Sequence, residues 1–127
     1  QLAGAIIVST PQDLSLIDAR KGLNMFKKVN VPILGIIENM SYFLCTECKT
    51  KHPIFGHGGA KLEAGKLGVP FLGEIPLDMK LRSTSDEGTP ILVSDPKHPI
   101  SKIYFQIADE ITKSITTQLK PAPVIIQ

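Results

Sequence analysis

Two runs of β-branched residues on either side of an amphipathic segment constrain the fold of this chain more than any other feature. Residues 5–9 (AIIVS) and 33–37 (ILGII) are continuous apolar runs, typical of strands buried on both faces of a parallel sheet. Between them, apolar residues recur at helical spacing and predict a helix over roughly residues 12–28. A strand, a helix and a second strand in this order form a βαβ unit with parallel strands and a right-handed crossover. The sequence therefore predicts an α/β fold.

The rest of the chain continues the alternation of helices and strands, apart from one irregular excursion expected over residues 41–55. We expect one domain over residues 1–120 and a tail at 121–127, because 127 residues suit a single core. The further expected elements are a helix over 60–67, a strand over 70–75 with a turn at 76–78, a short helix over 79–85, an edge strand over 90–93 and a last helix over about 100–119.

The composition excludes several classes of partner. There are 14 basic and 12 acidic residues, a net charge of +2, and the basic residues are scattered, so we expect no nucleic acid as partner. No apolar run reaches the roughly 18 residues that cross a bilayer, so we expect no membrane partner. Two cysteines do not make a disulfide scaffold and favour a reducing compartment, the cytoplasm or alternatively the mitochondrial matrix. The abrupt start at Gln1, without a methionine, predicts a piece of a longer protein.

The two cysteines, Cys45 and Cys48, are the strongest chemical signal. Two thiolates at this spacing can hold a metal ion or one edge of an iron–sulfur cluster, or they can form a redox disulfide. Tetrahedral zinc and cubane clusters usually need four ligands, so the pair is half of a site. His52 is a candidate third ligand, although a loop histidine facing solvent is the favoured interpretation. The remaining alternative is that the two cysteines are unrelated surface thiols with no chemical role.

Polar residues at the ends of the expected strands suggest a ligand site. Asn39 follows the second strand and residues 76–78 follow the third, and in open α/β sheets ligands bind at the carboxyl edge. The Asn39 amide suits a purine edge, but it suits a turn equally well. The segment 56–61 (GHGGAK) resembles a phosphate loop only superficially, because it lacks the G-x-x-x-x-G-K-[ST] spacing. A tight turn into a helix is the favoured interpretation there.

Five blocks in order resemble one known family. They are residues 4–13 (GAIIVSTPQD), 35–41 (GIIENMS), the Cys45/Cys48 pair, 55–56 (FG) and 73–78 (GEIPLD). Together they closely resemble the Mrp/ApbC family, P-loop ATPases of the MinD-like class that carry iron–sulfur clusters. The resemblance covers nearly the whole chain, from Gly4 to about Ile115, and implies the C-terminal half of a parallel-sheet, Rossmann-like P-loop NTPase domain.

The resemblance also implies a site. Cys45 and Cys48 of two chains would together hold one [4Fe–4S] cluster in a homodimer, and Asn39, Pro76, Leu77 and Asp78 would line the adenine side of an ATP pocket. Family members carry a lysine-bearing phosphate loop before the strand at Ala5, and this sequence contains none. We therefore expect the parent protein to be an ATPase that uses ATP and Mg²⁺, and we assign no catalytic residue to this chain.

The function expected from the resemblance is ATP-dependent iron–sulfur cluster carriage, in which a [4Fe–4S] cluster is transferred to apo-proteins. Two alternatives remain: a zinc-bridged dimer that serves assembly, and a partitioning-type ATPase that binds a protein partner. The cysteine pair argues against the second of these.

Overall fold

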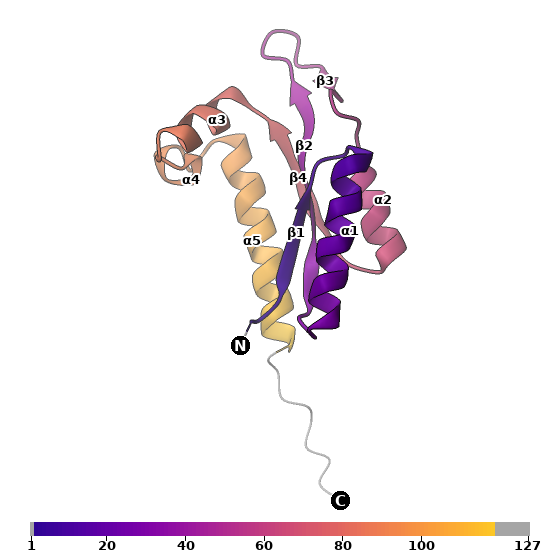
Figure 1. Cartoon of the computed structure of the whole chain (residues 1–127). Helices are drawn as coiled ribbons and strands as arrows, with labels where there is room; N and C mark the ends of the chain where they lie inside the picture. Colours follow the sequence, from indigo (N-terminus) through magenta and orange to yellow (C-terminus); the bar gives the residue numbers. More distant parts are fainter. Residues whose placement is uncertain (1, 119–127) are drawn as a thin grey trace, which may run out of the picture.

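The computed structural model describes residues 2–118 and has an α/β fold (Figure 1). The elements follow one another as β1 (Ala5–Ser9), α1 (Asp13–Lys28), β2 (Ile33–Leu44), β3 (Lys51–His52), α2 (Gly59–Leu67), β4 (Phe71–Leu77), α3 (Met79–Asp86), α4 (Ile91–Ser94) and α5 (Pro99–Gln118).

The sheet is built around β2. β1 and β4 pair with β2 in parallel, and the short strand β3 pairs with it antiparallel at its carboxyl end. Because Phe43 pairs with both β4 and β3, these two strands lie on opposite edges of β2. β3 therefore pairs with the same edge of β2 as β1 does, beyond the point where β1 ends. The predicted βαβ unit is confirmed, and its parallel strands bring their carboxyl ends to the same edge of the sheet.

Two helical layers cover the two faces of the sheet (Figure 1). Helices α1 and α2 pack on one face around Leu23 and Ile36, which are almost fully buried. Helix α5 packs on the other face, where Ile107 meets Ile37 and Ile75. The side chains of the adjacent residues Ile36 and Ile37 thus point to opposite faces of the sheet and pack in two different cores, as the alternation of side chains along a strand requires. The last helix expected over about residues 100–119 is confirmed as α5, Pro99–Gln118.

The first strand differs from its expected burial. Ala5, Ile7 and Ser9 are buried, but Ile6 and Val8 are 37% and 57% exposed. The reason is the position of α5, which packs over β4 and β2. The prediction that this strand is buried on both faces is wrong for the described chain, whereas β2 is buried on both faces from Leu34 to Glu38.

Two other expectations need correction. β2 continues to Leu44, so residues 41–44 belong to a strand and not to an irregular excursion. It continues because β4 and β3 supply hydrogen-bonding partners on both edges, with an irregularity near Met40, whose φ is 54°. β4 likewise includes Pro76 and Leu77, which were expected in a turn.

The edge strand expected over residues 90–93 is wrong, because Ile91–Ser94 form the helical turn α4. Pro90 begins the turn, and its carbonyl accepts bonds from the N–H groups of Val93 and Ser94. The turn buries Ile91, and the buried Ser101 of α5 donates its hydroxyl to the Ile91 carbonyl at 3.3 Å. An apolar run of this length cannot be assigned to strand or helix by periodicity alone.

Two predictions concern the outer limits of the chain. The tail at 121–127 lies outside the described residues, and the domain boundary at 120 stays a prediction. Among the helices of residues 2–118, none combines the length and the hydropathy that crossing a membrane requires.

Candidate functional site

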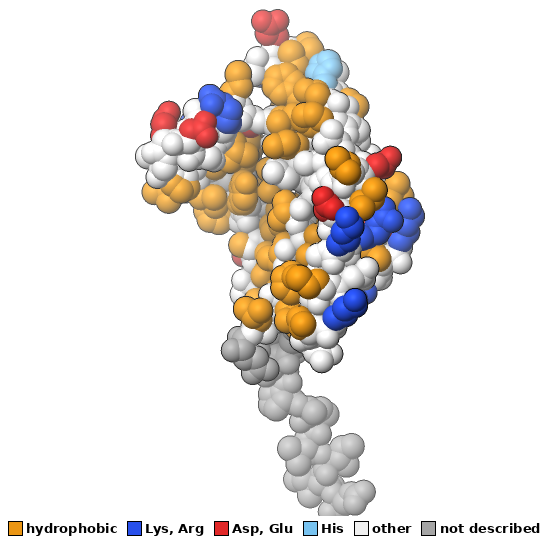
Figure 2. All heavy atoms as spheres, viewed as in Figure 1, with side chains coloured by type: hydrophobic (Ala, Val, Ile, Leu, Met, Phe, Trp, Pro, Cys, Tyr) orange, Lys and Arg blue, Asp and Glu red, His pale blue; other side chains and the backbone are white. Residues whose placement is uncertain are grey.

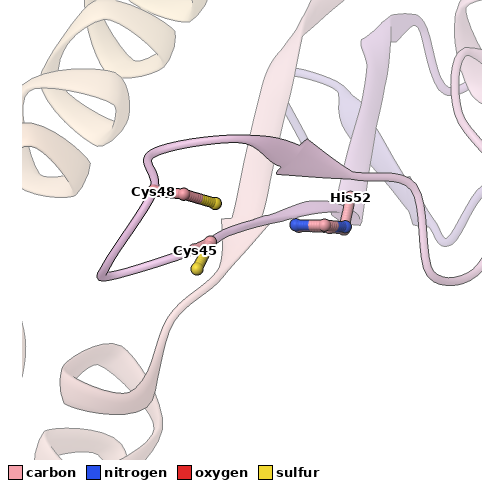
Figure 3. Close-up of side chains that lie close together, drawn as sticks. All are labelled: Cys45, Cys48 and His52. Carbon is pink, nitrogen blue, oxygen red and sulfur yellow. The ribbon is translucent and has the colours of Figure 1, made fainter.

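The two cysteines lie in the turn that joins β2 to β3 (Figure 3). The Cys45 N–H donates to the Thr50 carbonyl at 3.0 Å, and the Lys49 N–H donates to the Cys45 carbonyl at 3.0 Å. Lys49 has a φ of 59°, the left-handed conformation that reverses the chain direction. Cys45 is half-buried, Cys48 is exposed, and both are free thiols. The cysteines are therefore presented on a tight hairpin at the end of the sheet.

His52 joins the two cysteines. One ligand atom from each of Cys45, Cys48 and His52 lies within 4.8 Å of the other two. Figure 3 shows the three side chains on the two arms of the hairpin and its turn. Two sulfur ligands and one imidazole are a donor set that binds thiophilic metals. The structure thus brings together three residues that the sequence presented as a pair and an uncertain third.

The Cys48 thiol is acidic. Its pKa is lowered to about 6, first because the Thr50 hydroxyl lies 3.3 Å from the sulfur and can donate to the thiolate. The Thr50 backbone N–H and Cys45 lower the pKa further. At neutral pH this exposed sulfur is therefore mostly a thiolate, the form that binds metal. The pair lies in a β-hairpin and not at a helix N-terminus, the position that most often activates a redox cysteine pair.

A pocket of about 520 Å³ lies at the carboxyl ends of β2 and β4. Asn39, Pro76, Leu77 and Asp78, which the sequence placed at this edge, all line it, together with Phe43 and Tyr104. Asn39 lies within β2 instead of following it, and Asp78 is the N-cap of α3. The prediction that both segments meet in one crevice is confirmed by this geometry.

The pocket has an apolar wall and a few polar atoms. The Asn39 Oδ1 accepts from the Met40 N–H at 3.0 Å, which leaves its amide nitrogen to donate to a ligand. The Asp78 Oδ1 accepts from the Leu81 N–H at 2.8 Å, which leaves its second oxygen to accept. Burial raises the pKa of Tyr104, so this phenol stays protonated at neutral pH. The free Asn39 donor and the free Asp78 acceptor beside apolar surfaces suit a flat heterocycle such as a purine.

Phe43 connects the pocket to the hairpin. It lines the pocket, pairs with Leu77 of β4 on one side, and pairs with His52 of β3 on the other. The rings of Phe43 and His52 have centroids 6.5 Å apart and an interplanar angle of 36°. The two candidate sites are therefore neighbours along one strand, joined by a single aromatic side chain.

Glu38 is a buried polar residue that the sequence analysis did not single out. Its side chain is fully buried and accepts from the N–H groups of Gly58 at 2.9 Å and Ala60 at 2.8 Å, while the Ser41 hydroxyl donates to it at 2.6 Å. The Glu38 carboxylate, which projects from strand β2, thus caps the N-terminus of helix α2. The only signal in the sequence was an acidic residue inside an apolar run.

The capping by Glu38 decides between the two interpretations of the glycine-rich segment 56–61. An anion at the N-terminus of α2 would need the amide groups that already bind this carboxylate. The segment is therefore a turn into a helix, as favoured from its spacing. The Nε2 of His57, within this segment, lies 3.3 Å from the Glu74 carboxylate, and its ring is edge-on to Tyr42.

Comparison with known protein families gives an independent assignment. The family model described as ParA, NUBPL iron-transfer P-loop NTPase, matches residues 1–112. The chain is 54% identical over 114 residues to an iron-sulfur cluster transfer protein NUBPL of Dictyostelium discoideum, covering 90% of the chain and 35% of the relative. It is 50% identical over 115 residues to an iron-sulfur protein required for NADH dehydrogenase, mitochondrial, of Arabidopsis thaliana, covering 91% and 37%. The chain spans about a third of the length of these relatives.

Solved structures agree with this assignment. A nucleotide-binding protein of Archaeoglobus fulgidus, in complex with ADP and with cobalt, matches at a TM-score of 0.63 and 38% identity, covering 76% of the chain and 38% of that structure. The cell division ATPase MinD of Pyrococcus furiosus matches at a TM-score of 0.66 and 26% identity, covering 87% and 43%. The predicted Mrp-type, MinD-like relationship is thereby confirmed: the chain belongs to the ParA/NUBPL family of iron-transfer P-loop NTPases.

Proposed function

We propose that the intact protein is an iron–sulfur cluster carrier, which loads a cluster on Cys45 and Cys48 and delivers it to apo-proteins. The observation that carries this proposal is the hairpin that brings two free thiols and an imidazole within 4.8 Å of one another. Cargo that must be passed on needs an accessible and soft ligand set, which this hairpin offers. The names of the relatives support cluster transfer over a structural zinc module or a partitioning ATPase.

The cargo is a [4Fe–4S] cluster bridged between two copies of the chain. Each copy supplies two thiolates, and a two-fold axis through the hairpins supplies the four that a cubane cluster needs. Apolar side chains flank the hairpin: Leu44 is 43% exposed, Ile54 is 58% exposed and Phe55 is 36% exposed. Figure 2 shows hydrophobic side chains gathered at this end of the molecule. Such a surface suits contact with a second copy.

The pocket at the ends of β2 and β4 receives the adenine of ATP. Asn39 and Asp78 offer a donor and an acceptor to the base, and Pro76 and Leu77 offer apolar contact. The ADP complex of the Archaeoglobus protein supports a nucleotide site in this fold. The phosphates and Mg²⁺ would be held by a lysine-bearing loop that this sequence does not contain, so ATP hydrolysis is a proposal for the intact protein. The free thiols suit the cytoplasm or the mitochondrial matrix.

Anaerobic reconstitution tests the carrier proposal. The intact protein is incubated with iron and sulfide, and its absorption, Mössbauer spectrum and mass in solution are measured. We expect one [4Fe–4S] cluster per dimer and its transfer to an apo-dehydratase. Thr46→Ala, in the same turn, should keep the cluster, whereas Cys45→Ser with Cys48→Ser should lose it. A colourless wild-type protein, or a double variant that keeps the cluster, would overturn the proposal.

A further inference from the structure

The structure assigns a third ligand to the hairpin: we infer that His52 completes a mononuclear site with Cys45 and Cys48 within one chain. The site would take a thiophilic divalent cation such as Zn²⁺, Co²⁺ or Fe²⁺ without a second copy. The inference rests on the proposed function because both use the same two thiolates. It goes further because it proposes that a single subunit can bind a metal ion by itself.

The strand register places His52 beside Cys45. β2 and β3 pair Phe43 with His52 and Leu44 with Lys51, and the Cys45 N–H bond to the Thr50 carbonyl continues this ladder. Side chains two residues apart on a strand share a face, so Cys45 lies on the face of Phe43 and therefore of His52. Such diagonal neighbours across an antiparallel pair are close enough for long side chains to meet. The contact between sulfur and imidazole thus follows from the pairing.

The turn brings in the third atom. Lys49, in its left-handed conformation, reverses the chain directly after Cys48. The sulfur of Cys48 then lies within 4.8 Å of the Cys45 sulfur and of the His52 ring nitrogen. Bond lengths near 2.0–2.3 Å in a tetrahedral site put ligand atoms about 3.3–3.8 Å apart. Rotamer changes in an exposed turn can bring the three ligand atoms about 1 Å closer together, to the spacing that a tetrahedral metal ion requires.

His52 is held in position before any metal arrives. Its backbone is fixed by pairing with Phe43 on one side and by the Ile54 N–H, which donates to the His52 carbonyl at 3.0 Å, on the other. Its ring packs against Phe43. Pro53 follows and restricts the backbone further. A ligand whose backbone and ring are already placed loses less entropy on binding.

The donor set determines the class of metal. Two thiolates neutralise a divalent cation, and one neutral imidazole completes a three-ligand set typical of tetrahedral Zn²⁺ and Co²⁺. Three protein ligands leave the fourth position open to water or to a thiolate of another protein. Closed four-ligand sites are structural, whereas an open position lets an incoming ligand attack. The arrangement therefore suits a metal that is accepted and released.

Cobalt titration of the reduced, metal-free intact protein tests the inference, with Co²⁺ itself as the probe. We expect tetrahedral d–d bands and a thiolate-to-cobalt charge-transfer band that saturate at one Co²⁺ per chain. Light scattering should show a monomer at saturation. His52→Phe preserves the ring beside Phe43 but removes the ligand, so we expect at least tenfold weaker binding and altered d–d bands. His57→Phe, which changes a histidine outside the hairpin turn, should bind as the wild type does.

Two outcomes would overturn the inference: identical affinity and spectra for His52→Phe and the wild type, or saturation at one Co²⁺ per two chains. Nitrogen-15 chemical shifts of the histidines with bound Zn²⁺ give a second readout that does not depend on any variant. An unshifted His52 there would also overturn it. Cluster reconstitution of His52→Phe separates the two proposals, because a [4Fe–4S] cluster on the cysteines alone does not require this ring.

Discussion

Phe43 and His52 lie directly opposite each other on β2 and β3, and their rings are in contact at a centroid distance of 6.5 Å. Phe43 also lines the pocket between β2 and β4. A ligand in that pocket therefore touches a side chain that packs against the histidine beside the two cysteines. This relationship offers a short physical route between nucleotide binding and the state of the hairpin.

The first prediction concerns this route. In the wild type, ATP should change the rate at which Cys48 reacts with iodoacetamide, because a base in the pocket contacts Phe43 and so shifts His52. Phe43→Ala should abolish that nucleotide effect while nucleotide still binds. Alkylation followed by mass spectrometry measures the rate. Phe105→Ala on α5, a 47% exposed side chain that does not line the pocket, is the control. An undiminished effect in Phe43→Ala would refute the route.

The second prediction concerns the pKa of Cys48, which is lowered to about 6 chiefly by the Thr50 hydroxyl. A lowered thiol pKa means that the thiolate predominates above pH 6, so alkylation of the apo-protein should rise between about pH 5 and 7 and then level off. Thr50→Val removes the donor, raises the pKa and slows alkylation at pH 7. Thr46→Val should leave the profile unchanged. A midpoint near 8.5 in the wild type would contradict the assignment.

The third prediction concerns the cap that Glu38 provides to α2. Glu38→Gln keeps the size of the side chain but places an amide donor where one oxygen accepts from a backbone N–H. An unsatisfied buried donor costs about 1–3 kcal/mol, and we expect a loss of that size in the free energy of unfolding in urea. Glu110→Gln on the surface of α5 should change it by less than about 0.5 kcal/mol. Equal stability of the two variants would exclude the capping role.

The fourth prediction concerns the base. Asp78→Asn retains an oxygen that accepts from the Leu81 N–H and so keeps the cap of α3. It replaces the second oxygen by a donor, which opposes the 6-amino group of adenine. We expect adenine nucleotides to bind about tenfold more weakly, a loss of about 1.4 kcal/mol. Calorimetry with ADP measures the change, with Asp18→Asn on α1 as the matched variant. Unchanged affinity would remove Asp78 from the base site.

Most helices and strands were predicted well, because the spacing of apolar residues within one element is a local property that the sequence shows directly. The βαβ unit and the last helix followed from the spacing of apolar residues. The run at 90–93 failed because four apolar residues suit a strand or a helical turn, and only the contact of Ile91 with α5 decides. The exposure of Ile6 and Val8 depends on how far α5 extends over the sheet, which no local pattern encodes.

The residues of the candidate site were easier to predict from the sequence than their geometry. Cys45, Cys48, Asn39 and Asp78 were identified from residue types and motif order. The participation of His52 depends on its register opposite Phe43, and register is set by the turn and not by the histidine itself. Glu38 was not predicted because its partners lie about twenty residues away in another element.

The hairpin that joins β2 to β3 projects beyond the helices that cover the sheet (Figure 1). Its opening breaks a few exposed backbone bonds and no core contact, so its amides should exchange with solvent far faster than those of Leu34–Ile37. Under the proposed function, a cluster held on the hairpin is released by local opening of the hairpin alone. We therefore expect the rate of delivery to depend on the turn, and mutations that stabilise the core to leave that rate unchanged.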